Sequence, residues 1–386
     1  MFKLLQNVQL YSPGREGLRH VLVAGDKIAY IGANIPSLDP CLDVEITDFK
    51  GARLIPGFID AHAHVTGGGG EAGFETSVPA PFLSEFTSAG VTTVVGLLGT
   101  DDLVRTTSSL IARIKALRAE GLSAYGYTGG YHVPPTTLTG SVRGDIVHVE
   151  ELIAVGEVAI SDHRSSQPTL EEVLRLASEA HVAGLMTGKA GLVHFHVGDG
   201  VRGLDLLRRA VQESEIPARV FYPTHVNRKK ALFEEACELT KSGCTIDVTA
   251  FPVEEGEDAY SAEDAFMRYL DGGFDPSRIT ISSDGGGCLP KFNAQGELEG
   301  LDYARASALP LTLKSLLERG LELEHVLPAF TSNVSKILRL PSKGRLSIGS
   351  DADLVALGAD HWPSWVMARG AWHLKQSAIF KKGTFE

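Results

Sequence analysis

The chain has few cysteines, no paired cysteine motif and no long apolar run. Its four cysteines are scattered through 386 residues, which argues against a disulfide framework and against a thiolate zinc site. No apolar run approaches the length of a membrane-spanning helix, and the opening MFKLLQNVQLYSPG is too polar for a signal peptide. We therefore expect a cytoplasmic protein that has no membrane partner.

The chain also lacks an excess of basic residues. Its 36 Lys and Arg are outnumbered by 48 Asp and Glu, which gives a formal net charge of −12. Because a nucleic-acid partner requires a basic surface, we expect none, although a few arginines could still bind a small anionic substrate. The apolar fraction of 43% is that of a folded globular protein.

Strand-like and helix-like segments alternate through the middle of the chain. The eight strand-like segments are FIDAHAHV, VTTVVGLLG, SAYGYTGGYHV, EVAISDHR, LVHFHVGDG, RVFYPTHVN, TIDVTAF and ITISSDGG. This α/β alternation predicts a (β/α)8 TIM barrel over residues 55–339, with a doubly wound sheet as the alternative. Short strands return after residue 340, so we expect residues 1–54 and 340–386 to form one small β-sandwich domain.

The first polar cluster is His62-Ala63-His64, directly after the apolar FID of the first barrel strand. Side chains of a strand alternate between its faces, so residues two apart point the same way. Both imidazoles are therefore expected to point into the barrel mouth, where such barrels carry their active sites, and to hold one metal. The alternative is a pair of core or surface histidines.

Four further strands end in polar residues. Glu157 lies on the fourth strand and could bridge two metals, unless it is a surface residue. The fifth strand carries His194 and His196, of which His196 lies nearer the carboxyl end and is the better ligand, whereas His194 is expected to be packed or to support a ligand. His225 ends the sixth strand, and Asp284 ends the eighth before three glycines.

These six candidate ligands predict a binuclear metal site. Four histidines and two carboxylates supply three ligands to each of two divalent ions, with a bridging solvent molecule. Imidazole and carboxylate ligands suit zinc, with manganese, iron or cobalt as alternatives. Two such ions lower the pKa of a bridging water, so that a metal-bridging hydroxide becomes available for hydrolysis.

At these residues the chain resembles the amidohydrolase superfamily and, within it, the isoaspartyl (β-aspartyl) dipeptidases. The similarity runs over nearly the whole chain, in PGFIDAHAH, GGGGEAG, GVTTVVGLLGTD, TGGYHVP, AISDHRS, FHVGD, PTHVNR, SSDG and the terminal KGTFE. HxH and the late Asp are typical of the superfamily. GGGGEAG, LLGTD, YHVP and SDHRS are more specific to the dipeptidases.

The resemblance implies a role for each candidate ligand. His62 and His64 would bind the more buried metal, and His196 and His225 the other. Asp284 would bind the buried metal and act as the general base, then as the acid that protonates the leaving amine.

The resemblance also implies how a small dipeptide substrate is held. Tyr131 would polarise the scissile carbonyl and stabilise the oxyanion, and Glu71 would pair with the free α-amino group. Arg164 and Arg228 would hold carboxylates, which matches the one ammonium and two carboxylates of a β-aspartyl dipeptide. Further substrate contacts would come from Gly69 and Thr100.

Two residues depart from the family pattern. Most isoaspartyl dipeptidases resemble a type that has a carbamylated lysine on the fourth strand, where this chain has the shorter Glu157. The family also has a serine that contacts substrate where this chain has Cys288, and a thiol donates a weaker hydrogen bond than a hydroxyl.

Two other functions compete with the dipeptidase. A cyclic amidase related to dihydroorotases or hydantoinases would act on substrates without a free ammonium, which would leave Glu71 without a partner. A non-catalytic scaffold could keep the fold without the chemistry, although it would be expected to have lost ligands. The resemblance further implies a homo-oligomer, with an octamer as one expected form.

Overall fold

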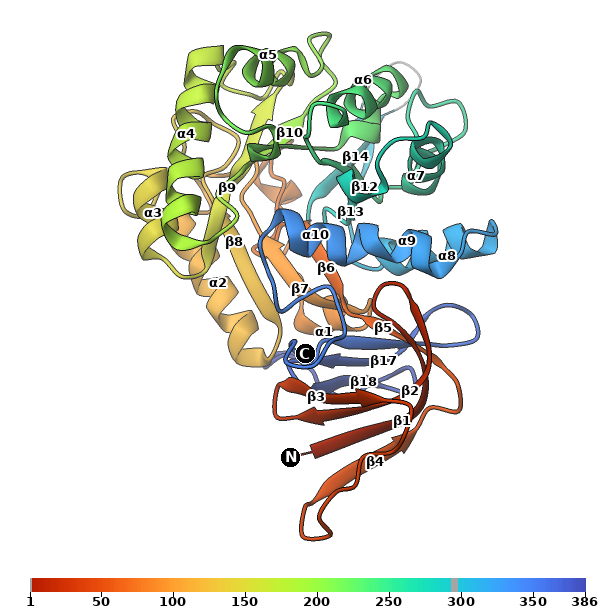
Figure 1. Cartoon of the computed structure of the whole chain (residues 1–386). Coiled ribbons are helices and arrows are strands. Elements are labelled where there is room, and N and C mark those ends of the chain that lie inside the picture. Colours follow the sequence, from red (N-terminus) through yellow and green to blue (C-terminus); the bar gives the residue numbers. More distant parts are fainter. Residues whose placement is uncertain (1, 293–297) are drawn as a thin grey trace.

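The computed structural model of the chain describes residues 2–292 and 298–386. Figure 1 shows a helix-covered barrel above a β-sheet domain, and the first and last strands of the chain both lie in that lower sheet. Within the described residues, none of the helices combines the length and the apolar character that crossing a bilayer requires.

The barrel is built from eight parallel strands that are almost completely buried. They are β6 (Phe58–Ala63), β7 (Val91–Gly96), β8 (Ser123–Thr128), β9 (Leu152–Ile160), β10 (Val193–Val197), β11 (Phe221–Thr224), β12 (Ile246–Thr249) and β13 (Ile279–Ser282). Strands β6 to β11 pair in sequence order, and β12 lies against β11 and pairs with β13. A parallel bridge from Ala63 to Gly285 links the last strand to the first. The predicted (β/α)8 barrel is confirmed, and the doubly wound alternative is excluded.

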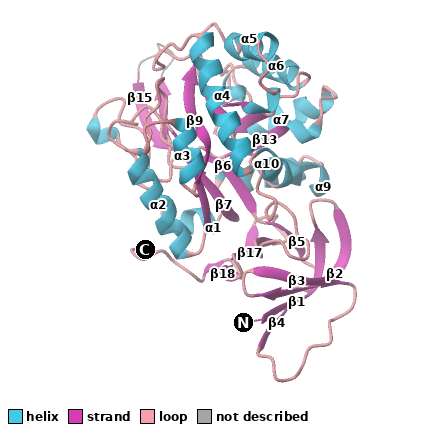
Figure 2. Cartoon of the chain, turned by 60° about the vertical axis from the view of Figure 1, so that its left-hand side comes forward, coloured by secondary structure: helices cyan, strands magenta, loops and turns pink. Residues whose placement is uncertain are grey.

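Helices cover the outer face of these strands and hide their apolar side chains from water. They are α1 (Leu83–Thr87), α2 (Thr107–Glu120), α3 (Val142–His148), α4 (Leu170–Thr187), α5 (Asp205–Glu213), α6 (Lys230–Thr240), α7 (Ala262–Asp271), α8 (Ala308–Glu318), α9 (Leu323–Val326) and α10 (Ser332–Ile337). Figure 2 shows α2, α3 and α4 on the outside of the barrel, where α2 packs against β8 and both α3 and α4 pack against β9. The capping box at the start of α4 is present, since Thr169 and Glu172 each bond the other's backbone N–H.

Five short 3₁₀ turns and one hairpin complete the barrel loops. The turns are η1 (Phe74–Thr76), η2 (Ala218–Val220), η3 (Val226–Arg228), η4 (Pro276–Arg278) and η5 (Leu327–Phe330), and the hairpin strands are β14 (Cys288–Phe292) and β15 (Leu298–Tyr303). The hairpin follows β13 directly, so it lies on the same side of the barrel as the carboxyl ends of the strands.

Both ends of the chain join in one nine-stranded, mostly antiparallel sheet. Its strands are β1 (Phe2–Tyr11), β2 (Arg15–Ala24), β3 (Lys27–Gly32), β4 (Val44–Asp48), β5 (Arg53–Pro56), β16 (Leu354–Leu357), β17 (Pro363–Ala368), β18 (Ala371–Lys375) and β19 (Ala378–Ile379). The ends meet where β5 pairs with β16, and side chains from both segments, such as Leu5, Leu354 and Trp372, share one core. The β-domain made by both chain ends is as expected, while its boundaries at residues 54 and 340 stay a prediction.

A buried lysine connects the segment that leads back to the β-domain with a strand of the barrel. Lys343, whose side chain is 2% exposed, contacts Asp351 at 2.7 Å, Asp353, and the hydroxyl of Ser123 on β8 at 2.6 Å. A buried charge is tolerated only when it is paired in this way, and removing one partner leaves the other uncompensated.

We therefore predict that Lys343→Met lowers the free energy of unfolding by about 3–5 kcal/mol in denaturant titration. The control is Lys241→Met, because Lys241 pairs with Glu238 at 2.7 Å while both side chains are largely exposed, and we expect a loss below about 1 kcal/mol there. An equal loss of unfolding free energy in the two variants would contradict a larger contribution from the buried ion pair.

Candidate metal centre

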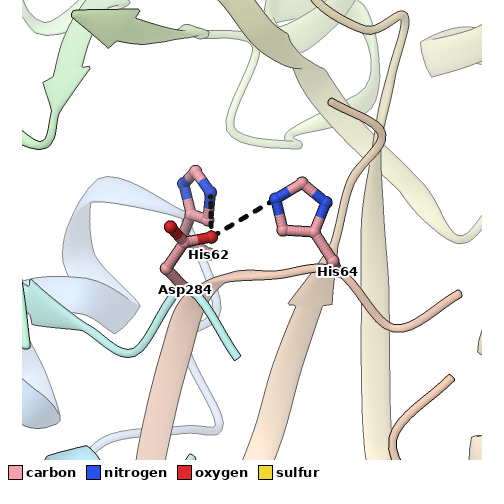
Figure 3. Close-up of side chains that lie close together, drawn as sticks. All are labelled: His62, His64 and Asp284. Carbon is pink, nitrogen blue, oxygen red and sulfur yellow. Dashed lines mark ion pairs between the residues drawn. The ribbon is translucent and has the colours of Figure 1, made fainter. Parts of the chain in front are cut away.

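Three of the predicted ligands meet at the junction of the first and last barrel strands. His62 lies on β6, His64 follows it, and Asp284 follows β13. The Nε2 atoms of both histidines lie 3.3 Å from Asp284 Oδ1, and Figure 3 shows both rings turned toward that carboxylate. These three residues form one candidate metal-binding group among the described residues.

Glu157 lies at the centre of the cluster. Its Oε1 is 3.4 Å from His64 Nε2, and its Oε2 is 3.5 Å from His62 Nε2 and 3.4 Å from His225 Nε2. His62, Glu157 and His225 form a second candidate group. One carboxylate therefore faces both groups, although its side chain is shorter than a carbamylated lysine.

The backbone at these strand ends is unusual for residues that carry side chains. His225 has φ 60° and Asp284 has φ 56°, in the left-handed region that non-glycine residues rarely adopt. Such conformations cost roughly 1–3 kcal/mol each and gather at functional sites. Here they turn each side chain inward at the point where its strand ends.

The charges in the cluster suit a cation. Burial alone would raise the pKa of Glu157 and of Asp284, but the surrounding histidines lower both pKa values below the usual range. Burial lowers the pKa of His225 to about 3, so its ring is neutral, the form that binds a metal. Burial also opposes the charged forms of His62 and His64, yet the two carboxylates raise both pKa values, so a metal would displace protons there.

Unpaired buried atoms show that the cluster fits a metal. His62 Nε2 and Asp284 Oδ1 are inaccessible to water and have no hydrogen-bond partner among the described residues. Buried polar atoms are almost always paired, so two of them aimed at each other across 3.3 Å are best explained by a shared ligand. Imidazole nitrogens with carboxylate oxygens form a donor set that zinc and similar divalent ions accept.

The two histidines of β10 occupy different positions. His194 Nε2 lies 2.9 Å from His62 Nδ1, behind the cluster, so His194 contacts a candidate ligand rather than the cluster itself. His196 Nδ1 lies 3.0 Å from Glu157 Oε2, but His196 is in neither candidate group. The hydroxyl of Tyr131 lies 2.8 Å from the same Nδ1, and burial raises the pKa of this phenol, which keeps it protonated.

The predicted substrate contacts lie at the open side of the cluster. Arg164 Nη1 is 2.9 Å from Glu71 Oε1, which also accepts a hydrogen bond from Thr100 at 3.0 Å. Arg164 lies over the Tyr131 ring at 5.5 Å, and Arg228 Nη1 lies 3.2 Å from His196 Nε2. Both guanidinium groups therefore border His196, and Glu71 joins them through its contact with Arg164.

Gly69 and Cys288 are neighbours in the same region as Glu71. A Cβ at Gly69, whose φ is +77°, would lie 3.0 Å from the Cβ of Cys288, so only glycine leaves that space open. Burial, together with Glu71 and Asp284, raises the pKa of the Cys288 thiol. It therefore stays protonated and offers only a weak hydrogen bond.

The amidohydrolase family profile matches residues 53–381. The chain belongs to the amidohydrolase family. A crystal structure of a beta-aspartyl dipeptidase from the thermophilic, keratin-degrading Fervidobacterium islandicum AW-1, in complex with beta-Asp-Leu, is 42% identical in sequence, with a TM-score of 0.92 over 100% of both chains. This match confirms the resemblance to the isoaspartyl dipeptidases.

More distant relatives are also similar over most of the chain. An imidazolonepropionase from a Ruegeria species is 24% identical over 86% of this chain and 85% of its own. A dihydroorotase from Halobacterium salinarum is 25% identical over 89% of this chain and 87% of its own. Together with the full-length match, the family assignment makes this protein a hydrolase that acts on amide bonds.

Two residues of this amidohydrolase site were not singled out from its sequence. Asp162, in the SDHRS motif, is buried beside His196 and Arg164, and the Thr249 hydroxyl lies 2.7 Å from His225 Nδ1. The position of Asp162 directly after the strand of Glu157 was an available signal. Thr249 ends β12 without any distinguishing motif, so its contact depends on the folded barrel.

Gly156 controls how closely the strand of Glu157 approaches β10. It has φ 151°, and a Cβ there would lie 2.7 Å from the carbonyl oxygen of His194. We predict that Gly156→Ala lowers the free energy of unfolding by about 2–4 kcal/mol, from overpacking plus backbone strain. Gly140→Ala is the control, because φ is +90° there and nothing lies within 4 Å, and about 1 kcal/mol is expected from strain alone. A Gly156→Ala loss no larger than the Gly140→Ala loss would refute the close approach.

Proposed function

We propose that this protein is a metal-dependent dipeptidase that hydrolyses β-aspartyl (isoaspartyl) dipeptides. The observation that carries the proposal is the pairing of Glu71 with Arg164 at 2.9 Å, next to Arg228 and to the cluster of candidate ligands. One acid and two guanidinium groups match the one ammonium and two carboxylates of such a dipeptide. The full-length similarity to a beta-aspartyl dipeptidase supports the same substrate class.

Binding exchanges ionic partners rather than creating new buried charges. The substrate's ammonium takes the place of Arg164 beside Glu71, and Arg164 turns to a substrate carboxylate. Arg228 holds the second carboxylate, while Gly69, Thr100 and Cys288 complete the pocket wall. Because every charge keeps a partner, desolvation costs little, whereas a cyclic amide has no ammonium that could take the place of Arg164 beside Glu71.

The proposal includes two metal ions, and zinc is the expected element. His62, His64 and Asp284 would hold one ion, His196 and His225 the other, and Glu157 would bridge them. Such a pair supplies hydroxide near neutral pH by lowering the pKa of a shared water. Homo-oligomeric assembly, with an octamer as one form, and a cytoplasmic location also belong to the proposal and rest on the sequence and the resemblance.

The residues of the chain then move the protons of the reaction. Asp284 takes a proton from the attacking water. The oxygen of that water forms a bond to the side-chain amide carbon of the aspartyl group. The Tyr131 hydroxyl donates a hydrogen bond to the carbonyl oxygen as negative charge develops on it. Asp284 delivers its proton to the leaving nitrogen, the C–N bond breaks, and aspartate and a free amino acid are released.

The assay that tests the function compares two substrate classes on one preparation. With zinc, manganese or cobalt added, β-Asp-Leu should be hydrolysed to aspartate and leucine, and hydantoin and dihydroorotate should not. Release of aspartate is followed by amino-acid analysis. Turnover of the cyclic amides without turnover of β-Asp-Leu would overturn the proposal.

Tyr131→Phe should lower kcat far more than it raises KM. An oxyanion donor acts mainly in the transition state, so a loss of about 3–4 kcal/mol, or a few hundredfold in kcat, is expected. Steady-state kinetics with β-Asp-Leu measures both constants. A pure KM effect would assign Tyr131 to substrate binding alone.

Glu157→Ala should lose at least one of two bound metals per chain. Two cations about 3.5–4 Å apart repel strongly without a shared anion. Glu157→Gln is the matched control for shape, and it should also lose metal because the bridge requires the negative charge. Atomic absorption on zinc-saturated protein decides the matter: one metal per chain in the wild type, unchanged in both variants, would exclude the bridge.

A further inference from the structure

Asp162 is a buried carboxylate that the proposed reaction does not use. It lies two residues after the end of β9, and its side chain is 2% exposed. Oδ1 accepts hydrogen bonds from the backbone N–H of Arg164 at 2.8 Å and from its Nε at 3.0 Å. Oδ2 accepts one from Arg164 Nη2 at 2.8 Å and lies 3.1 Å from His196 Nε2. One carboxylate thus contacts both a candidate ligand and a candidate substrate-binding residue.

The two nitrogens of His196 face different carboxylates. Nε2 faces Asp162, and Nδ1 lies 3.0 Å from Glu157 Oε2, on the side of the metal cluster. A neutral imidazole has one proton, and an ionised carboxylate can only accept. If Asp162 accepts the proton of Nε2, the lone pair of Nδ1 points to the cluster.

Two guanidinium groups lie near the same Nε2 and favour the opposite tautomer. Arg228 Nη1 is 3.2 Å away and Arg164 Nη2 is 3.4 Å away, and guanidinium nitrogens can only donate. Asp162 is closer than either, and Arg164 Nη2 already donates to Asp162 Oδ2 at the shorter distance of 2.8 Å. The carboxylate is therefore the stronger partner of Nε2.

The neighbouring chain leaves room for Asp162 in this position. A Cβ at Gly198, directly after β10, would lie 2.5 Å from the Cβ of Asp162 and from the carbonyl oxygen of Ser161, and 2.6 Å from Asp162 Oδ2. Gly198 does not have a left-handed conformation. A glycine is therefore needed here for the space it leaves, and the backbone conformation would accept other residues. The loop after the His196 strand is thus shaped around this carboxylate.

We propose that Asp162 is a positioning residue that holds His196 with Nδ1 directed at the metal cluster and, through its other contacts, fixes Arg164 for substrate binding. The inference rests on the proposed function, because it takes His196 as a ligand. Carboxylates that orient a ligating histidine typically change metal affinity by 10–100-fold when they are removed. Asp162 joins the metal site and the substrate site through a single side chain.

The test measures metal affinity without substrate. Zinc is titrated into full-length Asp162→Asn against a chelating dye, and one of two ions should bind roughly 10–100-fold more weakly than in the wild type. The same loss should persist when Asp162→Asn is made in an Arg164→Ala background. The visible spectrum of cobalt-loaded Asp162→Asn should also change, because a ligand of the ion is altered.

The control is Asp145→Asn. Asp145 is an equally buried carboxylate that accepts backbone hydrogen bonds from Leu138 at 2.9 Å and Thr139 at 2.7 Å, on α3 and its preceding loop. It should lower stability without changing zinc affinity. Gly198→Ala displaces Asp162 without removing it, so it should weaken zinc binding in the same direction and serves if Asp162→Asn does not fold.

Unchanged zinc affinity in both Asp162→Asn and Gly198→Ala would overturn the proposal. Loss of affinity that vanishes in the Arg164→Ala background would also overturn it, because Asp162 would then act through Arg164 alone. Failure of the proposed function is distinguishable, since it would appear in the wild type as absent β-Asp-Leu turnover, whatever the variants do to zinc binding.

Discussion

The site depends on a single carboxylate held between histidines of three strands. Glu157 lies within 3.5 Å of His62, His64 and His225, and 3.0 Å from His196. Without its charge, Asp284 alone would remain beside these buried rings to balance a cation. The barrel makes the arrangement possible, because neighbouring parallel strands bring side chains from distant parts of the chain to one edge.

The surrounding structure keeps that carboxylate in place. Gly156 lets its strand approach β10, and left-handed residues at the ends of β11 and β13 turn His225 and Asp284 inward. Further out, Asp162 and Glu71 compensate the guanidinium of Arg164, which weakens its repulsion of a cation in the cluster. Charge of alternating sign therefore extends from the cluster to the open side of the pocket.

Much of this was predictable from local pattern. Strand alternation placed His62 and His64 on one face, and the β–α repeat located the eight barrel strands, because both depend only on spacing along the chain. The turn at Gly25–Asp26, which joins β2 to β3, is equally local. The preference for His196 over His194 followed from depth along the strand, and His194 does lie behind His62.

The remaining contacts could not be predicted, because they join residues far apart in sequence. Glu71 and Arg164 are 93 positions apart, and which partner each chooses depends on the closed barrel. Side-chain length alone did not decide whether Glu157 extends to both candidate metal groups, because this depends on how close β9 lies to β10. The position of His196 between Glu157 and Asp162 requires both neighbouring loops to be folded.

The central claim is that one glutamate bridges two metals, and X-ray absorption at the zinc edge tests it most directly. In protein loaded with two equivalents of zinc, the account predicts nitrogen and oxygen ligands with no sulfur, and a metal–metal scattering distance of about 3.5–4 Å. Nitrogen and oxygen ligands without any metal–metal scattering at that distance would contradict it.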